Sequence, residues 1–263
     1  MSDFMCVFSA EKKYCKIVQA RAMIIAENRV VQKACTEKEN RALLDFTRIC
    51  EYTENNCVEA KTALGGFPES LWETYSAFAN TMGGYILLGV TENPDKTFST
   101  VDLPDAEKLL AEFYVKVNDP KRVSVNLIRN RDLYTATVNG NHIAVIYVPR
   151  ATREQRPVYV DGDIHNTFIR NGEGDIRLSE EQIRKMVRER EEARKLSDSM
   201  RYMGAITVWL TDHASASAKE LAARLELSTS QTRRYINRLI GKGVAEKQGS
   251  GPATKYRLKQ KPG

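Results

Sequence analysis

The sequence predicts an α+β fold made of two units, and three observations carry this prediction. Through most of the chain, short strand-like apolar runs alternate with amphipathic helical patterns, whereas the last quarter contains three helical patterns and a basic hairpin. Charge is uneven in the same way: residues 200–263 hold 12 Lys and Arg against 4 Asp and Glu, whereas residues 1–199 hold 28 against 30. A chain of 263 residues is also long enough for more than one domain.

These patterns divide the chain into four segments. Thr36 followed by Glu39 is a capping-box pattern, which predicts a helix from Glu37 to about Tyr52 that leads to Glu54. Earlier residues show no clear period. We therefore expect a stretch of unclear structure at 1–35, an α+β domain at 36–178, a charged connecting helix at 179–199 and a C-terminal domain at 200–263.

The α+β domain is organised around a strand, a helix and a second strand. Cys57–Thr62 is the first strand, and because side chains alternate along a strand, Glu59 and Lys61 point to the same side. The continuous apolar run Tyr85–Val90 predicts a central strand covered on both faces. Between them, Asn80 and Gly83-Gly84 end a helix whose apolar stripe is Leu71, Trp72, Tyr75, Phe78 and Ala79.

The rest of this domain consists of further short elements. Asn139-Gly140 and Asp161-Gly162 are turn signals that predict hairpins. We expect a helix at Ala106–Val117 and strands at Val123–Ile128, Leu133–Val138, His142–Val148, Pro157–Val160 and Thr167–Arg170.

A helix of very high charge follows, opened by a second capping box at Ser179 and Gln182 and continuing to about Lys195. Charges of both signs on such a helix favour a solvated connector over a nucleic-acid contact. The same helix could pack against its twin in a dimer.

The last segment has the pattern of a winged helix-turn-helix. A helix is expected at Met200–Leu210, Ser217 caps a helix at Lys219–Leu225, and Ser228 caps a helix at Thr229–Ile240. Two short strands around a Gly-Ser-Gly-Pro tip complete the arrangement, and the stretch from Ser217 to Gly251 resembles this fold throughout.

This resemblance implies that the second helix of the motif enters the major groove of DNA and that the hairpin contacts the backbone or the minor groove. The net charge of +8 in this segment favours DNA over the alternative, a winged helix that contacts protein. Half-sites are read best in pairs, so a homodimer is expected. The candidate DNA-contacting residues are Thr229, Ser230, Gln231, Arg233, Arg234 and Asn237 on the helix and Lys247, Lys255 and Arg257 on the wing.

The α+β domain also carries a resemblance. The spacing of Glu54, Glu59 and Lys61, followed by FANTMGGYILLGV and later by HIAVIYVPRA, RPVYV and TFIRNGEGD, resembles the Schlafen-type AlbA-like domain over roughly half the chain. The resemblance implies a mixed sheet and nucleic-acid binding, with RNA as a possible partner of this domain. Some Schlafen proteins are metal-dependent endoribonucleases of transfer and ribosomal RNA that use two glutamates and an aspartate.

Carried over to this sequence, the two glutamates are Glu54 and Glu59, and Glu92 stands where the family has an aspartate pair. With Mg²⁺ or Mn²⁺ these carboxylates would form a nuclease site, in which Lys61 contacts a phosphate. The plainer interpretation is an exposed ion pair between Glu59 and Lys61. Arg170 has two interpretations of equal weight: a phosphate contact, or an ion pair with Glu173 or Asp175.

Other classes of protein are not indicated. Five cysteines without a C-x-x-C pair and three scattered histidines predict neither disulfides nor a zinc site, and a phosphate-binding GxxxxGK[ST] loop is absent. No apolar run is long enough to span a membrane, and the first residues lack the apolar region of a signal peptide. We therefore expect a reduced, cytoplasmic protein without a membrane partner.

The leading hypothesis is a DNA-binding transcriptional regulator, which needs no cofactor for binding. The alternative is a metal-dependent endoribonuclease of the Schlafen kind.

Overall fold

A computed structural model describes residues 57–172 and 174–259. The expected helix at 37–52, Glu54 and Glu173 lie outside these residues.

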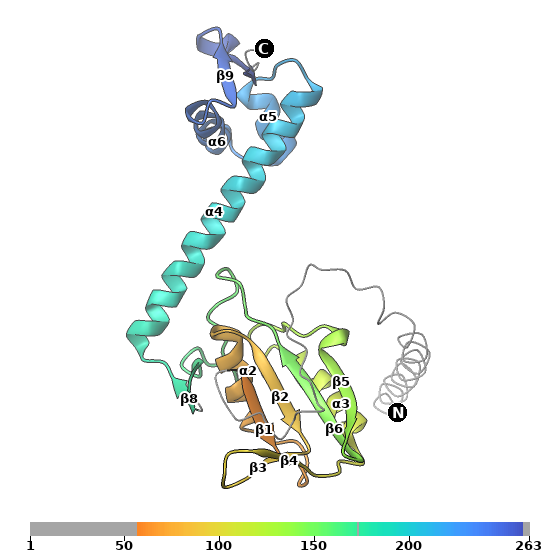
Figure 1. The fold of residues 1–263 in the computed structure, drawn as a ribbon. Helices are drawn as coiled ribbons and strands as arrows, with labels where there is room; N and C mark the ends of the chain where they lie inside the picture. Colours follow the sequence, from red (N-terminus) through yellow and green to blue (C-terminus); the bar gives the residue numbers. More distant parts are fainter. Residues whose placement is uncertain (1–56, 173, 260–263) are drawn as a thin grey trace, which may run out of the picture. The chain divides into compact units, whose positions relative to one another are not determined.

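The first unit is built on a four-stranded mixed sheet (Figure 1). Strand β1 (Val58–Lys61) lies parallel to β2 (Gly84–Leu88), and the sheet continues with antiparallel β6 (Asn141–Val148) and β5 (Leu133–Val138). Strand β2 is buried along its whole length, as expected for the apolar run that begins at Tyr85. The expected hairpin between β5 and β6 is present, with Asn139 and Gly140 both at positive φ.

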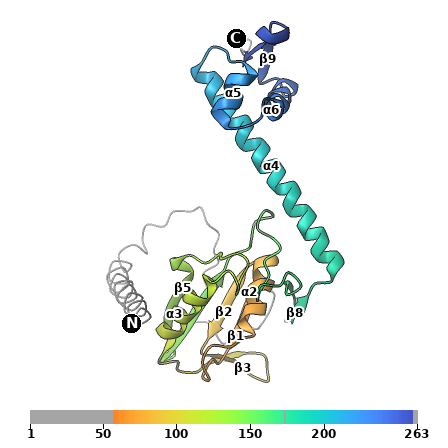
Figure 2. The ribbon, with the colours of Figure 1, turned by 180° about the vertical axis from the view of Figure 1, so that it is seen from behind.

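Helices α2 (Leu71–Asn80) and α3 (Ala106–Val117) pack on one face of this sheet (Figures 1 and 2). Their aromatic side chains form the centre of the core, where the rings of Trp72 and Phe113 stack with centroids 5.4 Å apart. The predicted stripe of α2 is confirmed, because all five of its residues are buried.

The Gly83-Gly84 pair explains how α2 turns directly into the central strand. Gly83 has φ +78°, and a Cβ atom there would lie 2.8 Å from the carbonyl oxygen of Val148. A Cβ atom on Gly84 would lie 2.8 Å from both the carbonyl oxygen of Cys57 and the ring of Phe78. Only glycine permits this conformation and this close approach.

Strand β2 ends at Leu88, two residues before the predicted end at Val90, and Gly89 follows it at positive φ. Two short strands follow, β3 (Val90–Glu92) and β4 (Phe98–Thr100). A hairpin of β7 (Phe168–Asn171) and β8 (Gly174–Arg177) packs against α2. The buried Asn80 side chain connects these parts, since its amide donates to the carbonyl oxygens of Val158 and Phe168.

One predicted strand, Val123–Ile128, does not form. The Tyr75 hydroxyl donates to the carbonyl oxygen of Val125 and accepts from the amide of Leu127, both at 2.9 Å. A side chain therefore takes the backbone hydrogen bonds that a neighbouring strand would have made. Residues 157–160 likewise make only isolated bridges, to Val123 and Thr167.

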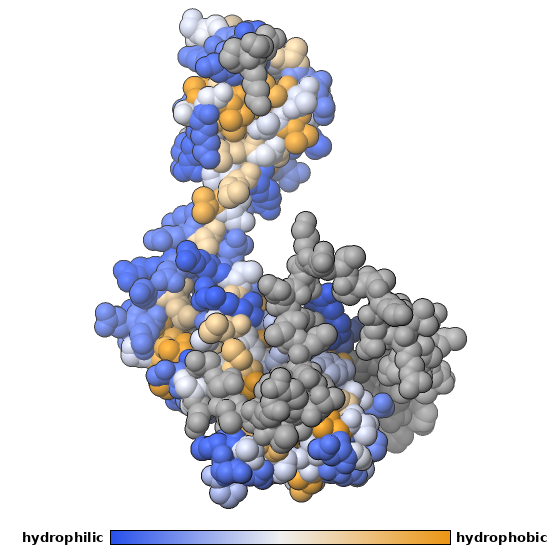
Figure 3. Space-filling view, viewed as in Figure 1, coloured by the Kyte–Doolittle hydropathy of each residue, from blue (hydrophilic) through white to orange (hydrophobic). Residues whose placement is uncertain are grey.

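Helix α4 (Glu180–Asp212) has 33 residues and includes both the expected connecting helix and the expected helix at Met200–Leu210. Its predicted capping box at Ser179 and Gln182 is present. No Gly or Pro lies between the two expected helices to interrupt the backbone hydrogen bonds. Hydrophilic residues prevail on the visible surface of its first half (Figure 3).

The last part of the chain forms the predicted three helices and hairpin. Helices α5 (Ala218–Leu225) and α6 (Thr229–Gly241) pack with the end of α4, and strands β9 (Ala245–Gln248) and β10 (Lys255–Leu258) form the wing. Their core includes Ile206, Leu210, Leu221, Ile236 and Leu239.

Candidate functional site

The pair Glu59 and Lys61 lies on strand β1, at the edge of the sheet, and both side chains point the same way. The Lys61 Nζ atom is 2.7 Å from Oε1 of Glu59, as the two-residue spacing predicts. The two side chains differ in exposure: 7% for Glu59 and 32% for Lys61. The ion pair is therefore present, with a buried carboxylate and a lysine at the rim.

Arg170, on β7, binds Glu59 on its buried side. Its side chain is 1% exposed, and its Nη2 atom donates to Oε2 of Glu59 at 2.6 Å. Its Nη1 atom donates to Oδ1 of Asp175 at 2.9 Å, and the Thr74 hydroxyl donates to the other oxygen of Asp175 at 2.7 Å. The guanidinium also lies over the ring of Phe78, 5.4 Å from its centroid.

This surrounding keeps Arg170 charged. Burial alone lowers the pKa of the guanidinium, but the hydrogen bonds and charges of Asp175 and Glu59 more than offset it, so the pKa is raised. Of the two interpretations of Arg170, the ion pair with Asp175 is confirmed. A phosphate would reach this guanidinium only if one of its carboxylate partners moved away.

The described carboxylates of the predicted metal site, Glu59 and Glu92, are paired with cationic side chains. Both oxygens of Glu59 already bind cationic side chains, and Glu92, on β3, pairs with Lys96 at 3.4 Å. Over residues 57–172 and 174–259, no group of three or more His, Cys, Asp or Glu side chains is arranged to hold a metal ion. Glu54 lies outside the described residues, so the three-carboxylate site and the endoribonuclease activity remain predictions.

Sequence reasoning missed Thr74, because its position on a buried helix face indicates packing and nothing else. Asp175 was predicted as one of two partners of Arg170, and it lies directly opposite Arg170 in the β7–β8 hairpin. The turn at Asn171-Gly172 was the available signal.

The second candidate surface is the outer face of α6. Ser228 caps this helix and forms a capping box with Gln231, while Thr232, Ile236 and Leu239 face the core. The predicted DNA-contacting residues lie on the other side: Thr229 is half-buried, and Ser230, Gln231, Arg233, Arg234 and Asn237 are exposed.

Gln231 differs from the two arginines of this helix in its hydrogen-bond partners. The Oε1 atom of Gln231 accepts from the backbone amide of Ser228 at 3.2 Å and from the Ser228 hydroxyl at 2.9 Å. Arg233 and Arg234 have no carboxylate within 4.0 Å among the described residues. The two arginines therefore present uncompensated positive charge.

The basic residues of the wing also differ in exposure and in their partners. Lys247, on β9, and Lys255, on β10, are exposed, whereas Arg257 is half-buried and forms an ion pair with Glu246. A nearby arginine, Arg238, has a structural role, since it donates to the buried hydroxyl of Ser199 on α4 at 2.6 Å.

Comparison with known families assigns both units. Residues 54–179 match the family model "Schlafen, AlbA_2". The first unit is a Schlafen AlbA_2 domain. Residues 210–246 match the model "Winged helix-turn-helix DNA-binding", so a winged helix follows the Schlafen AlbA_2 domain in the order that the sequence predicts. Together the two matches support a nucleic-acid-binding protein, and the winged helix points to DNA.

Two solved structures are similar to this chain. One is the N-terminal domain of a Nitrosomonas europaea protein described as related to the ATP-dependent DNA helicase RecG, with 29% identity and a TM-score of 0.40; the match covers 52% of this chain and 95% of that one. The other is the DIP2311 protein of Corynebacterium diphtheriae, with 17% identity and a TM-score of 0.35; the match covers 65% of this chain and 29% of that one. No curated protein matches. None of the described helices is long and apolar enough to cross a membrane.

Proposed function

We propose that this protein is a DNA-binding transcriptional regulator that reads DNA with α6 and holds the backbone with the wing. The observation that carries the proposal is the exposed, uncompensated pair Arg233 and Arg234 on a helix whose opposite face is buried in the core. An α-helix fits the major groove of B-DNA, which is about 12 Å wide. The N-terminal residues of such a helix lie nearest the base edges.

The wing supports this role. Lys247 and Lys255 are exposed on neighbouring strands of the hairpin, where they can neutralise phosphates on either side of the groove. Arg257 is engaged by Glu246, so it contributes less free charge. Capture of phosphates by lysine and arginine requires no cofactor. Binding as a homodimer to two half-sites, as for other helix-turn-helix proteins, is part of the proposal.

The test is a duplex-binding titration at several salt concentrations. Arg233→Ala combined with Arg234→Ala is expected to weaken binding at least tenfold and to reduce the slope of log K against log salt by up to about 1.8, the full value applying where both side chains neutralise phosphates. Arg184→Ala with Arg188→Ala, which removes the same charge from the exposed surface of α4, is the matched control. Unchanged affinity and slope in the α6 variant would exclude α6 as the reading helix.

A further inference from the structure

A second group of cations lies on the Schlafen AlbA_2 domain, in the loop that follows β6. Arg150, Arg153 and Arg156 fall within seven residues of one another. Arg150 and Arg153 are exposed, and Arg156 is half-buried. Because these arginines lie far from α6 in the sequence and belong to another domain, they need an explanation of their own.

The loop is fixed against the C-terminal end of α2. The amide of Ala151 donates to the carbonyl oxygen of Ala79 at 2.8 Å, and the Nη1 atom of Arg156 donates to the carbonyl oxygen of Asn80 at 3.4 Å. Within the loop, the amide of Arg156 donates to the carbonyl oxygen of Thr152 at 3.1 Å. A cation at a helix C-terminus is favourable, and these bonds hold the loop in one conformation.

The charges of the three arginines are not compensated by nearby carboxylates. Among the described residues, none of the three has a carboxylate within 4.0 Å. Arg122 of the same domain shows the contrast, since its Nη1 atom lies 2.6 Å from Asp161 and 3.1 Å from Glu69. Arg122 is therefore compensated by nearby carboxylates, and the three arginines of the loop are not.

Arg156 shows that the three charges act on one another. Burial and the repulsion of Arg150 and Arg153 lower the pKa of its guanidinium, and attraction by Glu189 only partly opposes this. Its Nε atom is buried and has no hydrogen-bond partner in the described part of the chain. Like charges held together in this way are stabilised by an anion.

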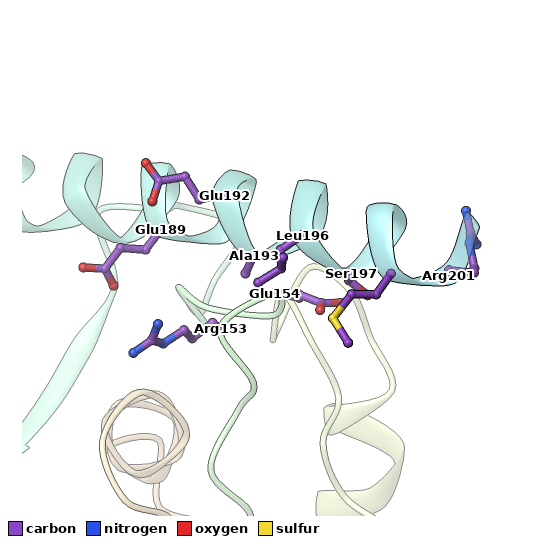
Figure 4. A pocket seen from close by; sticks show the side chains of 9 residues that line it. Arg153, Glu154, Glu189, Glu192, Ala193, Leu196, Ser197 and Arg201 are labelled. Carbon is purple, nitrogen blue, oxygen red and sulfur yellow. The ribbon is translucent and has the colours of Figure 1, made fainter. Parts of the chain in front are cut away.

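The neighbouring hollow is not a suitable site for such an anion. That hollow, of about 680 Å³, is lined by the loop and by α4 (Figure 4). Its lining includes Glu154, Glu189 and Glu192 but only two cations, Arg153 and Arg201, so the carboxylates are in excess. The excess positive charge belongs to the loop itself.

We propose that Arg150, Arg153 and Arg156 form a second phosphate-binding site, on the Schlafen AlbA_2 domain, that holds the sugar–phosphate backbone of a nucleic acid. This second site presupposes the proposed function, namely that the protein binds nucleic acid. It adds a contact that is independent of the winged helix. Arginine suits this role because its planar guanidinium donates two parallel hydrogen bonds to a phosphate.

The test compares variants of the full chain on two probes, a mixed-sequence DNA duplex and a folded transfer RNA. Arg150→Gln with Arg153→Gln removes the two exposed charges and leaves Arg156 on its contact with Asn80. The matched control is Lys108→Gln with Lys121→Gln, two exposed lysines of the same domain. On the probe that the site holds, the arginine variant is expected to bind about tenfold more weakly, with a salt slope reduced by up to about 1.8.

The results for the arginine variant and the lysine control distinguish between support for the second site and its rejection. Loss on one or both probes in the arginine variant alone supports the site and identifies DNA, RNA or both as its ligand. Equal affinity to wild type on both probes, or an equal loss in the lysine control, overturns it. If Arg233→Ala with Arg234→Ala weakens duplex binding while the loop variant binds both the duplex and the transfer RNA as wild type does, the regulator proposal stands and the second site fails. If the loop variant binds more weakly while the α6 variant binds the duplex as wild type does, the second site is supported and α6 is excluded as the reading helix.

Discussion

At the scale of single residues, the Schlafen AlbA_2 domain contains a chain of ion-paired side chains that leads from Lys61 at the surface to the buried Arg170. Lys61, Glu59, Arg170 and Asp175 alternate in sign, and the exposed fraction falls from 32% at Lys61 to 1% at Arg170. Removing one partner of a buried ion pair leaves the other charged group without compensation, and this is more costly than losing an exposed pair. Substitution of the buried Glu59 and of the partly exposed Lys61 should therefore affect stability differently.

Glu59→Ala is expected to lower the free energy of unfolding by about 3–5 kcal/mol, because the buried Arg170 would lose one of the two carboxylates that it pairs with in the described part of the chain. Lys61→Ala removes only the partly exposed end of the same chain and should cost about 0–1 kcal/mol. Urea unfolding of both variants measures the difference. If the two variants lose equal stability, the burial of Glu59 has no energetic consequence.

The glycine at position 83 gives a second prediction of this kind. Gly83→Ala combines positive φ with a Cβ atom 2.8 Å from the carbonyl oxygen of Val148, whereas Gly140→Ala has positive φ and open space. The second substitution should cost about 1–2 kcal/mol from backbone strain alone. The first should cost about 1–3 kcal/mol more, from overpacking. Thermal or urea unfolding tests this order, and equal losses would refute the close approach of Gly83 to β6.

At the scale of elements, the winged helix is held by its helix caps. The Glu220 side chain accepts from the amide of Ser217, its partner in the capping box of α5, at 2.7 Å. This backbone hydrogen bond is the main cause that lowers the pKa of Glu220. A carboxylate with a lowered pKa stabilises the fold above its unfolded pKa, and that stabilisation is lost as the pH falls through the folded value.

The winged helix is therefore expected to lose stability from this cap as the pH falls below about 4, near the ordinary pKa of glutamate. Glu220→Gln keeps a side chain that can accept the same hydrogen bond but cannot titrate. The difference in unfolding free energy between wild type and this variant should change with pH in the acid range and be constant above about pH 6. A difference that is independent of pH throughout would show that the pKa of Glu220 is not lowered by the cap.

At the scale of the whole molecule, the longest helix gives the clearest prediction. Ser197 is exposed near the middle of α4, and Ser197→Pro would break its backbone hydrogen bonds at a cost of about 3 kcal/mol. Ser197→Ala is the control and should be neutral or slightly stabilising. Far-ultraviolet circular dichroism and unfolding curves distinguish the two. Tolerance of proline would mean that two helices meet near this position.

How much of this molecule the sequence predicts depends on the range of the interactions involved. Local signals were sufficient for the stripe of α2, the helix caps at Ser217 and Ser228, the Asn139-Gly140 hairpin and the same-side placement of Glu59 and Lys61. These features depend on neighbours a few residues away.

Long-range contacts decided the remainder. The expected strand at Val123–Ile128 is replaced by irregular chain because Tyr75, some fifty residues earlier, binds its backbone. Arg170 is buried because it meets Glu59, which is 111 residues away in the sequence. Contacts between residues so far apart in the sequence cannot be predicted from spacing or periodicity. The residues of the site could therefore be named from the sequence, but their burial could not.

The cap at the start of α6 has a consequence for the bases that the protein can recognise. Both hydrogen bonds accepted by the Gln231 carbonyl come from Ser228, so only the NH₂ group of this side chain is left to face a base. Pairing of a glutamine with adenine is bidentate and needs the carbonyl to accept from the N6 amino group. As long as the cap is intact, Gln231 can act only as a donor, and its partner in the major groove should be an acceptor such as O6 or N7 of guanine or O4 of thymine.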